Sequence, residues 1–292
     1  MKDSKASQGE PLPVTTIIVH YRTEEHLVRC LDDLALRPDR PREVTVVDNA
    51  SLRDPDHWRA RYPHAHWVFL EENRGYAAGV NAGAGSATSA FLLLLNPDAR
   101  PDPGSLRTLV AFMSAHDEAG AAASQLLSPD GAPQSSGGSF PTFRSLALEK
   151  LARIGKRKRR APSDLPRSLP VAMDWVSATV MLCRRTAFEA VDGMDEGFFL
   201  YYEDCDFGLR LREKKWLSYV LPAARAVHYG GASFKGDQQL QLEAFHASED
   251  RYFRMHRPRW EGFALRLLRP VYDGLKLRDP LYPKSSGKPA SR

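Results

Sequence analysis

Residues 14–116 alternate between apolar runs of strand length and longer segments with helical periodicity. The apolar runs predict strands at Thr15–His20, Val44–Asp48, His66–Leu70 and Phe91–Asn96. The helical pattern predicts helices at Glu24–Leu36, Asp54–Tyr62 and Gly75–Ala87, and a further helix that is capped by Asp102 and runs to about His116. Strands that alternate with helices indicate right-handed crossovers and a mostly parallel sheet.

The middle of the chain has a different pattern. Residues 128–170 are rich in Ser, Gly and Pro and include the basic run 156–160, which predicts a long mobile loop with a short helix over Leu146–Ile154. Later residues predict a buried strand at Asp174–Arg184, a capping box at Thr186 and Glu189, a helix at Glu203–Lys215, short strands at Leu217–Leu221 and Ala226–Tyr229, and basic helices from Gln238 onward.

Composition narrows the class of protein. The 292 residues are 42% hydrophobic and 26% charged, as in an ordinary soluble globular protein. No apolar run approaches the roughly 18 residues of a membrane-spanning helix. The polar segment 1–13 predicts a flexible tail without a secretory signal. Three widely spaced cysteines without a C-x-x-C pair favour a reducing cytosol and argue against a disulfide framework: Cys30, Cys183 and Cys205.

Charge is divided unevenly between the two halves of the chain. Residues 1–140 carry 13 basic and 18 acidic side chains, a net charge of −5, whereas residues 141–292 carry 28 and 18, a net charge of +10. A basic half favours phosphate groups, an anionic membrane surface or nucleic acid as partners. No RRM, KH, helix-turn-helix or zinc pattern is present, so no nucleic-acid partner is expected.

Polar residues follow three of the predicted strands, at the edge where parallel sheets bind ligands. Asp48 suits hydrogen bonds to a ribose or a base, although Asp48 and Asn49 also read as a turn, which the local sequence favours. The glycine-rich start of a helix after Asn73 suits a phosphate or, equally, close helix packing. Asp98 suits a hard cation such as Mg²⁺, or a turn before the next helix.

Two further candidates lie in the second half. Glu203 and Asp204 follow a run of aromatic residues, and apolar surroundings raise the proton affinity of a carboxylate, which suits a general base. The alternative is that acidic residues simply favour a helix N-terminus. On a helix each residue faces the one four positions later. Gly208 stands four positions after Asp204, which predicts open space beside that carboxylate, whereas Arg210 stands four positions after Asp206, which predicts an ion pair. His228, before two glycines, is either a metal ligand or a structural histidine.

The order of these motifs from Val14 to Ser233 resembles the family 2 glycosyltransferases of the GT-A fold, most closely the rhamnosyltransferase-like branch. The matching segments are TTIIVHYR, VVDNAS, ENRGYAAGVNAG, FLLLLNPDA, Asp130–Ser136, DWVSA, GMDEGFFLYYEDCDFGLRLR and VHYGGAS. The resemblance implies an α/β, Rossmann-like fold with a mostly parallel central sheet, helices on both faces and a C-terminal helical extension. The implied divisions are a catalytic domain at 14–235, made of a nucleotide-sugar half at 14–128 and an acceptor half at 129–235 with a basic loop near 129–170, and an extension at 236–292.

The resemblance also implies a role for each candidate. Asp98 ligates a divalent cation, Mg²⁺ or Mn²⁺, that holds the donor diphosphate, with His228 as a further ligand. Asp204 is the catalytic base, with Glu203 beside it. The predicted nucleotide and donor site contains His20, Tyr21, Arg22, Asp48, Asn73, Gly75, Asn81, Asn96 and Trp175.

The implied activity is an inverting transfer of a sugar from a dTDP- or UDP-linked donor to a hydroxyl of a glycan or lipid-linked glycan in cell-envelope polysaccharide synthesis. The favoured donor is dTDP-L-rhamnose, and UDP-galactofuranose, UDP-glucose and UDP-N-acetylglucosamine are alternatives. The other class considered is a non-catalytic nucleotide-sugar-binding scaffold, against which the intact Asp98, Asp204 and His228 argue.

Four positions depart from the family pattern. Arg22 stands where Asn is usual, Val80 where Asn is common, Ala178 where Gly is usual, and Lys215 where a Gly precedes an aromatic residue. The substitution at Ala178 predicts a narrower acceptor side. None of the four removes a proposed catalytic group.

The C-terminal part predicts contact with an anionic surface. Residues 251–292 carry 11 basic and 3 acidic side chains, and apolar residues recur near helical spacing at Phe263, Leu267, Leu268, Val271 and Leu275. This indicates an interfacial amphipathic segment or, alternatively, the solvated charged face of a packing helix. Pro270 is expected to break or kink the helix. The resemblance favours a cytoplasmic protein held peripherally on the inner face of the plasma membrane.

Overall fold

A computed structural model describes residues 10–154, 169–230 and 238–276. The chain forms two compact units, one of residues 1–140 with 161–233 and one of residues 141–160 with 234–292. The predicted basic run 156–160 lies outside the described residues.

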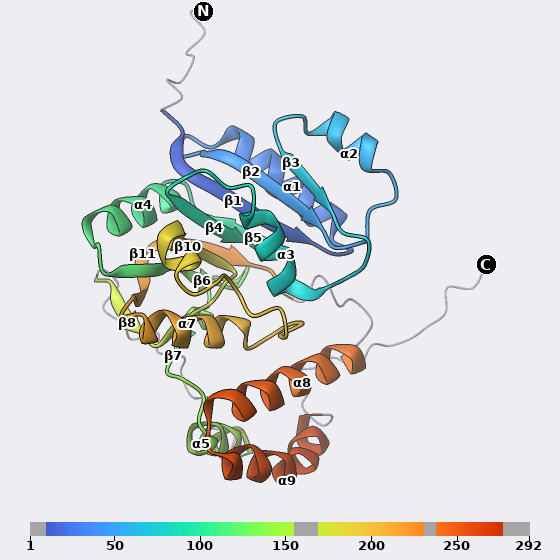
Figure 1. Cartoon of the computed structure of the whole chain (residues 1–292), viewed down its shortest axis with the longest axis vertical. Helices are drawn as coiled ribbons and strands as arrows, with labels where there is room; N and C mark the ends of the chain where they lie inside the picture. Colours follow the sequence, from blue (N-terminus) through green and yellow to red (C-terminus); the bar gives the residue numbers. More distant parts are fainter. Residues whose placement is uncertain (1–9, 155–168, 231–237, 277–292) are drawn as a thin grey trace, which may run out of the picture. The chain divides into compact units, whose positions relative to one another are not determined.

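The first unit contains one large sheet and six of the helices described (Figure 1). Its strands follow the order β3-β2-β1-β4-β10-β6-β11-β5, and β8 also pairs with β11. The strands are β1 Leu12–His20, β2 Pro41–Asp48, β3 His66–Phe69, β4 Phe91–Leu95, β5 Ala99–Pro101, β6 Ala119–Leu127, β8 Val171–Met173, β10 Val180–Arg184 and β11 Leu217–His228, with a separate pair of β7 Gly137–Gly138 and β9 Trp175–Val176. The helices are α1 Glu24–Leu36, α2 Pro55–Arg61, α3 Gly75–Ala84, α4 Ser105–Ala115, α6 Arg185–Glu189 and α7 Glu203–Glu213.

The predicted parallel α/β arrangement is confirmed. β1, β2, β3 and β4 pair in parallel, as do β6 and β11, whereas β10, β5 and β8 run antiparallel to their neighbours. The β1–β2 register sets His20 opposite Asp48, so the polar residues that end both strands lie at the same edge.

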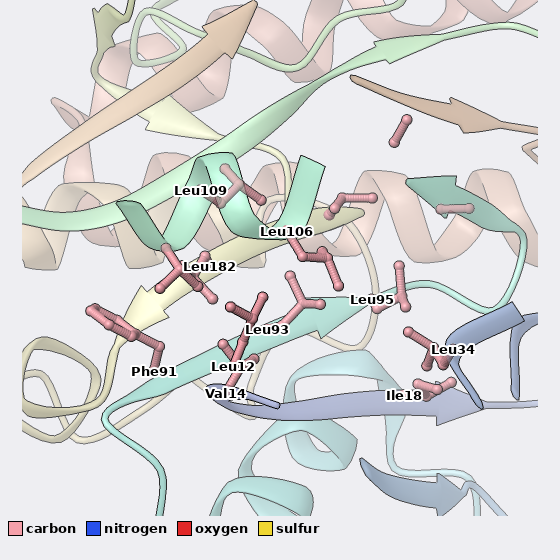
Figure 2. Close-up of a cluster of buried hydrophobic side chains, with 14 of the residues drawn as sticks. Leu12, Val14, Ile18, Leu34, Phe91, Leu93, Leu95, Leu106, Leu109 and Leu182 are labelled. Atoms are coloured by element: carbon pink, nitrogen blue, oxygen red, sulfur yellow. The ribbon is translucent and has the colours of Figure 1, made fainter. Parts of the chain in front are cut away.

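Two hydrophobic layers enclose the sheet because side chains alternate along each strand. In β4, Leu93 and Leu95 join the core beneath α1, α2 and α4, whereas Leu92 and Leu94 join the core that includes residues of α3, α6 and α7. Figure 2 shows the first core, in which Leu106 and Leu109 of α4 pack over β4. The continuous apolar run of β4 is therefore explained by burial on both faces.

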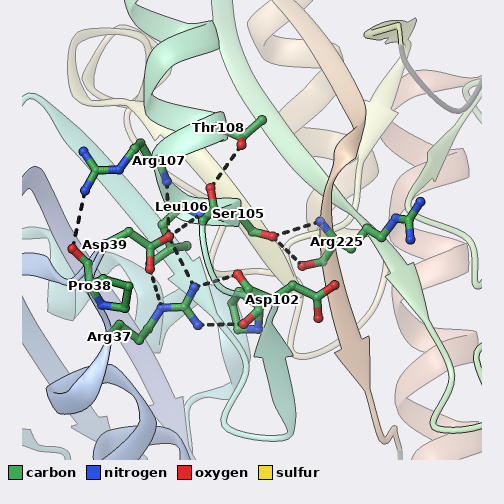
Figure 3. Close-up of polar contacts among 11 residues, drawn as sticks. Arg37, Pro38, Asp39, Asp102, Ser105, Leu106, Arg107, Thr108 and Arg225 are labelled. Carbon is green, nitrogen blue, oxygen red and sulfur yellow. Dashed lines mark hydrogen bonds and ion pairs between the residues drawn. The ribbon is translucent and has the colours of Figure 1, made fainter. Parts of the chain in front are cut away.

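Two predicted helix caps are wrong. α4 begins after Gly104, at φ +86°, and Asp102 does not cap it. Instead Asp39 accepts hydrogen bonds from the backbone N–H groups of Leu106 and Arg107, while the buried Arg37 pairs with Asp39 (Figure 3). The cap thus comes from a residue far away in the sequence, where no local motif could reveal it.

The predicted capping box at Thr186 and Glu189 is also absent. The structure shows no side-chain cap on α6, and Glu189 pairs with Arg185 at 2.7 Å. Other differences concern strands. The expected strand over Asp174–Arg184 is divided into β9 and β10, and the two expected strands near the end are one strand, β11, with an irregular register between Leu221 and Arg225.

The second unit contains α5 Phe143–Ile154, α8 Gln238–His256 and α9 Arg259–Lys276. Contrary to the expected break, α9 continues through Pro270. Ion pairs hold this helix to the residues before it: Glu261 pairs with Arg257, and Arg269 pairs with Glu249 and Asp250.

Candidate active site

Asp98 and His228 meet at the end of the sheet. Ala99 of β5 pairs with His228 of β11, and the N–H of Tyr229 donates to the carbonyl of Asp98 at 3.0 Å. This places Nε2 of His228 3.6 Å from Oδ1 of Asp98. The strand pairing therefore brings together the two residues that the sequence analysis proposed as metal ligands.

Gln134 orients the His228 ring. Nδ1 of His228 lies 2.9 Å from Oε1 of Gln134, and Nε2 of Gln134 donates to the His228 carbonyl at 2.9 Å. Burial lowers the pKa of His228, although the charge of Asp98 opposes the shift. A neutral ring whose Nδ1–H donates to Gln134 carries its lone pair on Nε2, toward Asp98. The sequence analysis assigned Gln134 no role.

The pair fits a divalent cation that is completed by other ligands. A carboxylate oxygen and an imidazole nitrogen are both donors used by Mn²⁺, and Mg²⁺ commonly binds one or two carboxylates plus substrate phosphates. Among the residues that the structure describes, no cluster of three or more His, Cys, Asp or Glu side chains forms a candidate metal site. The remaining coordination positions would therefore fall to water or to a substrate.

A small pocket opens beside Asp98. Its walls come from α1, from the corner between β4 and β5, and from the end of β11, and they consist of His26, Arg29, Cys30, Pro97, Asp98, Arg100 and Tyr229. Arg29 is exposed, whereas Arg100 is held by Asp33 at 2.8 Å. Cationic side chains thus stand next to the candidate metal ligand, as an anionic substrate requires.

Glu203 and Asp204 begin α7 after a strained turn. Tyr201 and Tyr202 both have positive φ, 68° and 65°, in the left-handed region that side chains rarely adopt. The turn delivers Glu203 to a buried position where its Oε2 has no hydrogen-bond partner. Burial and the neighbouring charge of Asp204 raise the pKa of Glu203.

Asp204 is more exposed than Glu203 and accepts more hydrogen bonds. The N–H of Cys205 donates to its Oδ1 at 2.9 Å, and a second backbone hydrogen bond comes from Ala178. Burial nevertheless raises the pKa of Asp204, and these donors only partly offset the rise. The pair therefore combines an unpartnered acid with a carboxylate whose proton affinity suits general base chemistry.

The expected open space beside Asp204 is absent. A Cβ atom on Gly208 would lie 2.8 Å from the Asp174 carbonyl and 2.9 Å from Cα of Trp175, so the glycine allows α7 to pack against β9. By contrast, the predicted ion pair between Asp206 and Arg210 is present, at 2.7 Å.

Tyr76 contacts the backbone of Ala178, which also supplies a hydrogen bond to Asp204. Its hydroxyl donates to the Ala178 carbonyl at 2.9 Å. Burial raises its pKa well above the ordinary value, and the charges of Glu203, Asp204 and Asp98 add to the shift. Tyr76 was not among the predicted site residues, although it directly follows Gly75, which was.

The residues predicted to bind the nucleotide at the ends of β1 and β2 are held by local hydrogen bonds. His20 is fully buried, its Nδ1 lies 2.8 Å from Oγ1 of Thr23, and its Nε2 has no partner. Burial lowers the pKa of His20. Asp48 accepts from the N–H and hydroxyl of Ser51 and from the N–H of Leu52, so the predicted turn is present.

The other predicted donor-site residues hold the scaffold together. Asn73 accepts from the N–H of Gly75, and the N–H of Asn96 donates to the Thr179 carbonyl. Asn81 is engaged by both the N–H and the carbonyl of Met194, so its amide fixes the loop before Phe198. Nε1 of Trp175 donates to the Ser139 carbonyl.

Residues 15–190 match the model of the family described as glycosyl transferase family 2. The chain is a family 2 glycosyltransferase. It is 30% identical over 297 residues to the N-acetylglucosaminyl-diphospho-decaprenol L-rhamnosyltransferase of Mycobacterium tuberculosis, covering 94% of each chain. It is 26% identical over 225 residues to the rhamnosyltransferase WbbL of Escherichia coli K12, covering 74% of this chain and 83% of the relative.

A solved structure has the same fold. The crystal structure of GalNAc-T7 with UDP, GalNAc and Mn²⁺ superposes with a TM-score of 0.61 at 14% identity, over 82% of this chain. The glycosyltransferase spans about half of that longer chain, 47%. The expected GT-A fold is thereby confirmed, and the relatives make this a rhamnosyltransferase-like member of the family.

The structure shows the surroundings of three positions that depart from the family pattern in this glycosyltransferase. Arg22 has φ +54° and its guanidinium lies over the Tyr21 ring, 5.0 Å from the centroid. Lys215 has φ +67°, a conformation that favours the glycine usual there. Val80 is fully buried in the core beneath α3. The fourth, Ala178, lies between Tyr76 and Asp204.

Proposed function

We propose that this glycosyltransferase performs an inverting, metal-dependent transfer of a sugar from a nucleoside-diphosphate donor to a hydroxyl of a lipid-linked glycan in cell-envelope polysaccharide synthesis. The single observation that carries the proposal is that one backbone segment contacts both halves of the site: the Thr179 carbonyl accepts from the N–H of Asn96, two residues before Asp98, and the adjacent Ala178 supplies a backbone hydrogen bond to Asp204. A metal ligand and a candidate base that share one neighbourhood suit a one-step displacement.

The printed names of the relatives support the choice of donor and acceptor. The mycobacterial relative is named as an L-rhamnosyltransferase acting on a diphospho-decaprenol acceptor, and WbbL is also named as a rhamnosyltransferase. We therefore favour dTDP-L-rhamnose, with UDP-galactofuranose, UDP-glucose and UDP-N-acetylglucosamine as the competing donors.

Asp98 and His228 would hold the divalent cation, Mg²⁺ or Mn²⁺. When bound, the cation supplies Lewis-acid stabilisation of the negative charge on the departing diphosphate. GalNAc-T7 was crystallised with Mn²⁺, which supports the same use of a metal in this fold. The basic side chains beside Asp98, among them Arg29, would face the same phosphates.

Asp204 would accept the proton of the attacking hydroxyl. The acceptor oxygen forms a bond to the anomeric carbon from the face opposite the leaving group, and the bond to the diphosphate oxygen breaks with its electron pair. One displacement inverts the configuration and needs no covalent intermediate. The raised pKa of Asp204 favours proton transfer, since a base is most effective when its pKa lies near the working pH.

Glu203 would serve this step in its protonated form. Its buried, unpartnered Oε2 and raised pKa favour a neutral acid, which can donate a hydrogen bond to a sugar hydroxyl. Two ionised carboxylates side by side would repel each other, so a neutral Glu203 leaves the charge on Asp204.

We further propose that the protein works in the cytoplasm as a peripheral protein on the inner face of the plasma membrane. Among the described residues, no helix is long and apolar enough to cross a membrane. α9 exposes three large apolar side chains at helical spacing, Trp260, Phe263 and Leu267, which are 60%, 65% and 64% exposed. Arg259 and Arg266 are exposed on the same helix, as in interfacial segments that bind anionic lipid.

The decisive experiment incubates the purified chain with Mn²⁺, a synthetic prenyl-diphosphate glycan and each of the four candidate nucleotide sugars. We expect transfer with dTDP-L-rhamnose, loss of transfer with EDTA, and an inverted anomeric centre by NMR of the product. Transfer from one of the other three nucleotide sugars would show that the proposed donor is wrong and would identify the donor. Nucleotide-sugar binding without transfer or hydrolysis under all conditions would favour the scaffold function instead.

A further inference from the structure

The Ala178–Thr179 segment, which joins β9 to β10, is bonded to three parts of the candidate site. The Ala178 carbonyl accepts from the hydroxyl of Tyr76 on α3 at 2.9 Å. The same residue supplies a backbone hydrogen bond to Asp204 on α7. Its neighbour Thr179 accepts from the N–H of Asn96, in the corner that carries Asp98, at 2.9 Å. One short segment therefore links the base, the metal corner and Tyr76.

We propose that Tyr76 is a positioning residue for the base: its hydroxyl holds the carbonyl of Ala178 and thereby fixes the backbone of the residue whose own N–H is directed at Asp204. The role rests on the proposed function, because it assigns a purpose to Asp204. It requires no contact between Tyr76 and the substrate. It also explains why a polar aromatic residue stands at this position of a helix otherwise made of small residues.

The start of α3 is built to hold Tyr76 in place. Gly75 has φ +86°, and a Cβ atom there would lie 2.3 Å from the Phe199 carbonyl oxygen. That close approach allows the N–H of Tyr76 to donate to the same carbonyl at 2.8 Å. Phe199 belongs to the segment that leads into Glu203, so Tyr76 is anchored to the acid pair through its backbone and to Ala178 through its hydroxyl.

Removing the hydroxyl would deprive a buried carbonyl of a donor. Ala178 is only 5% exposed, and a buried polar group without a partner costs more than the hydrogen bond is worth in water. The peptide would then turn to recover a partner. The N–H and the carbonyl of Ala178 belong to two peptide groups that meet at its Cα atom, so a rotation about that atom would also displace the N–H and weaken its hydrogen bond to Asp204.

The direction of the effect on Asp204 follows from the groups that face it. Glu203 and the thiol of Cys205 stand beside it on α7, and Tyr76 of α3 contacts Ala178, the residue that supplies its second backbone hydrogen bond. The backbone donors of Cys205 and Ala178 are the contacts that favour its charged form. Weakening one of them raises the proton affinity of Asp204 further.

The first test titrates the Asp204 carboxyl by NMR in the purified chain labelled with ¹³C at the aspartate side-chain carboxyl, with Asp204→Asn to assign the signal. We expect Tyr76→Phe to raise the midpoint by roughly half a pH unit or more. Tyr62→Phe is the matched control, since Tyr62 donates to Asp32 on the surface, and it should leave the midpoint unchanged. An unchanged midpoint in Tyr76→Phe overturns the inference. If that variant does not fold, Tyr76→Met, which also lacks the hydroxyl, provides the same comparison.

The second test measures sugar transfer against pH. Tyr76→Phe should move the acid limb to higher pH by the same half unit or more, and should therefore lower kcat by roughly threefold or more below the midpoint, with little change in KM for the nucleotide sugar. A lower kcat with an unmoved acid limb indicates a merely structural role and overturns the proposal. If the wild-type chain transfers no sugar, the proposed function fails, but the NMR titration still decides on the Tyr76 contact because it needs no substrate.

Discussion

The Nε2 atom of His228 lies 3.6 Å from Oδ1 of Asp98, and the amide of Gln134 holds the opposite side of the same imidazole ring at 2.9 Å. The ring is therefore fixed in both orientation and tautomer before any ligand binds. Such an outer partner is a usual feature of metal-binding histidines, because it keeps the lone pair aimed at the ion.

Loss of Gln134 should weaken metal use without removing a ligand. We expect Gln134→Ala to raise the Mn²⁺ concentration for half-maximal transfer by roughly 10-fold or more, because His228 loses the partner that orients it. The measurement is a Mn²⁺ titration of activity. Gln239→Ala is the control, since Gln239 contacts Glu243 on an exposed helix. Equal Mn²⁺ requirements in both variants would refute the orienting role.

The two members of the acid pair should respond differently to neutralisation. Asp204→Asn should lower kcat at least about 100-fold, since a positioned base contributes about 10²–10⁴-fold. Glu203→Gln keeps a neutral group of the same shape and should retain most of the activity. Both variants should still bind nucleotide in calorimetry. Near-normal turnover in Asp204→Asn would remove Asp204 from its role.

In the wild type, kcat should rise with pH through a midpoint above the ordinary aspartate value of 3.8, because burial raises the pKa of Asp204.

The buried Glu203 should make the fold less stable as the pH rises. Its pKa is raised above the ordinary value of 4.5 by burial and by Asp204. A group with a raised folded-state pKa contributes stability that is complete below its unfolded pKa and is lost as the pH rises through its folded pKa. Glu203→Gln has no such dependence, so we expect its Tm to exceed that of the wild type at pH 8 and the gap to close toward pH 5. Glu213→Gln, on the exposed end of α7, serves as the control. A gap independent of pH would contradict the shift.

Lys215 should be replaceable by glycine with a gain in stability. It follows the C-terminus of α7 at φ +67°, where the N–H of Lys215 donates to Arg212 and that of Trp216 donates to Leu211. This is the helix-ending motif that glycine favours, and a side chain in the left-handed region costs about 1–2 kcal/mol. We expect Lys215→Gly to raise the free energy of unfolding in urea by ~1 kcal/mol. Lys214→Gly, at φ −86°, should lower it, and the opposite order would disprove the explanation.

The exposed face of α9 should determine membrane binding. Substituting Trp260, Phe263 and Leu267 by Ser should abolish flotation with phosphatidylglycerol vesicles, because the apolar side chains no longer insert. Wild-type binding should weaken with salt and be lower with phosphatidylcholine, since each basic residue near an anionic surface contributes about 1 kcal/mol. Leu36→Ser, at an 82% exposed position on α1, is the control. Failure of the wild type to bind anionic vesicles, or self-association of the wild type alone, would show that this face has another occupant.

The sequence by itself determined the alternation of strands and helices from β1 to α4, apart from the short β5, and the residue types at the edge of the sheet, but it did not predict β6 in the middle of that sheet. Periodicity is a local property, so the β4 strand could be predicted from its continuous apolar run, and the helices from their periodic apolar positions. The turn at Asp48 and the ion pair of Asp206 with Arg210 could also be predicted, because each joins residues at most four positions apart in the sequence.

Only the tertiary structure decided which distant groups meet. Asp39 caps α4, Gly208 lets α7 approach β9, Gln134 fixes His228, and Tyr76 holds Ala178. Each of these contacts joins segments more than thirty residues apart, and no spacing rule along the chain encodes them. They arise because strand order brings remote segments to one edge of the sheet, where buried polar groups require partners wherever the fold supplies them.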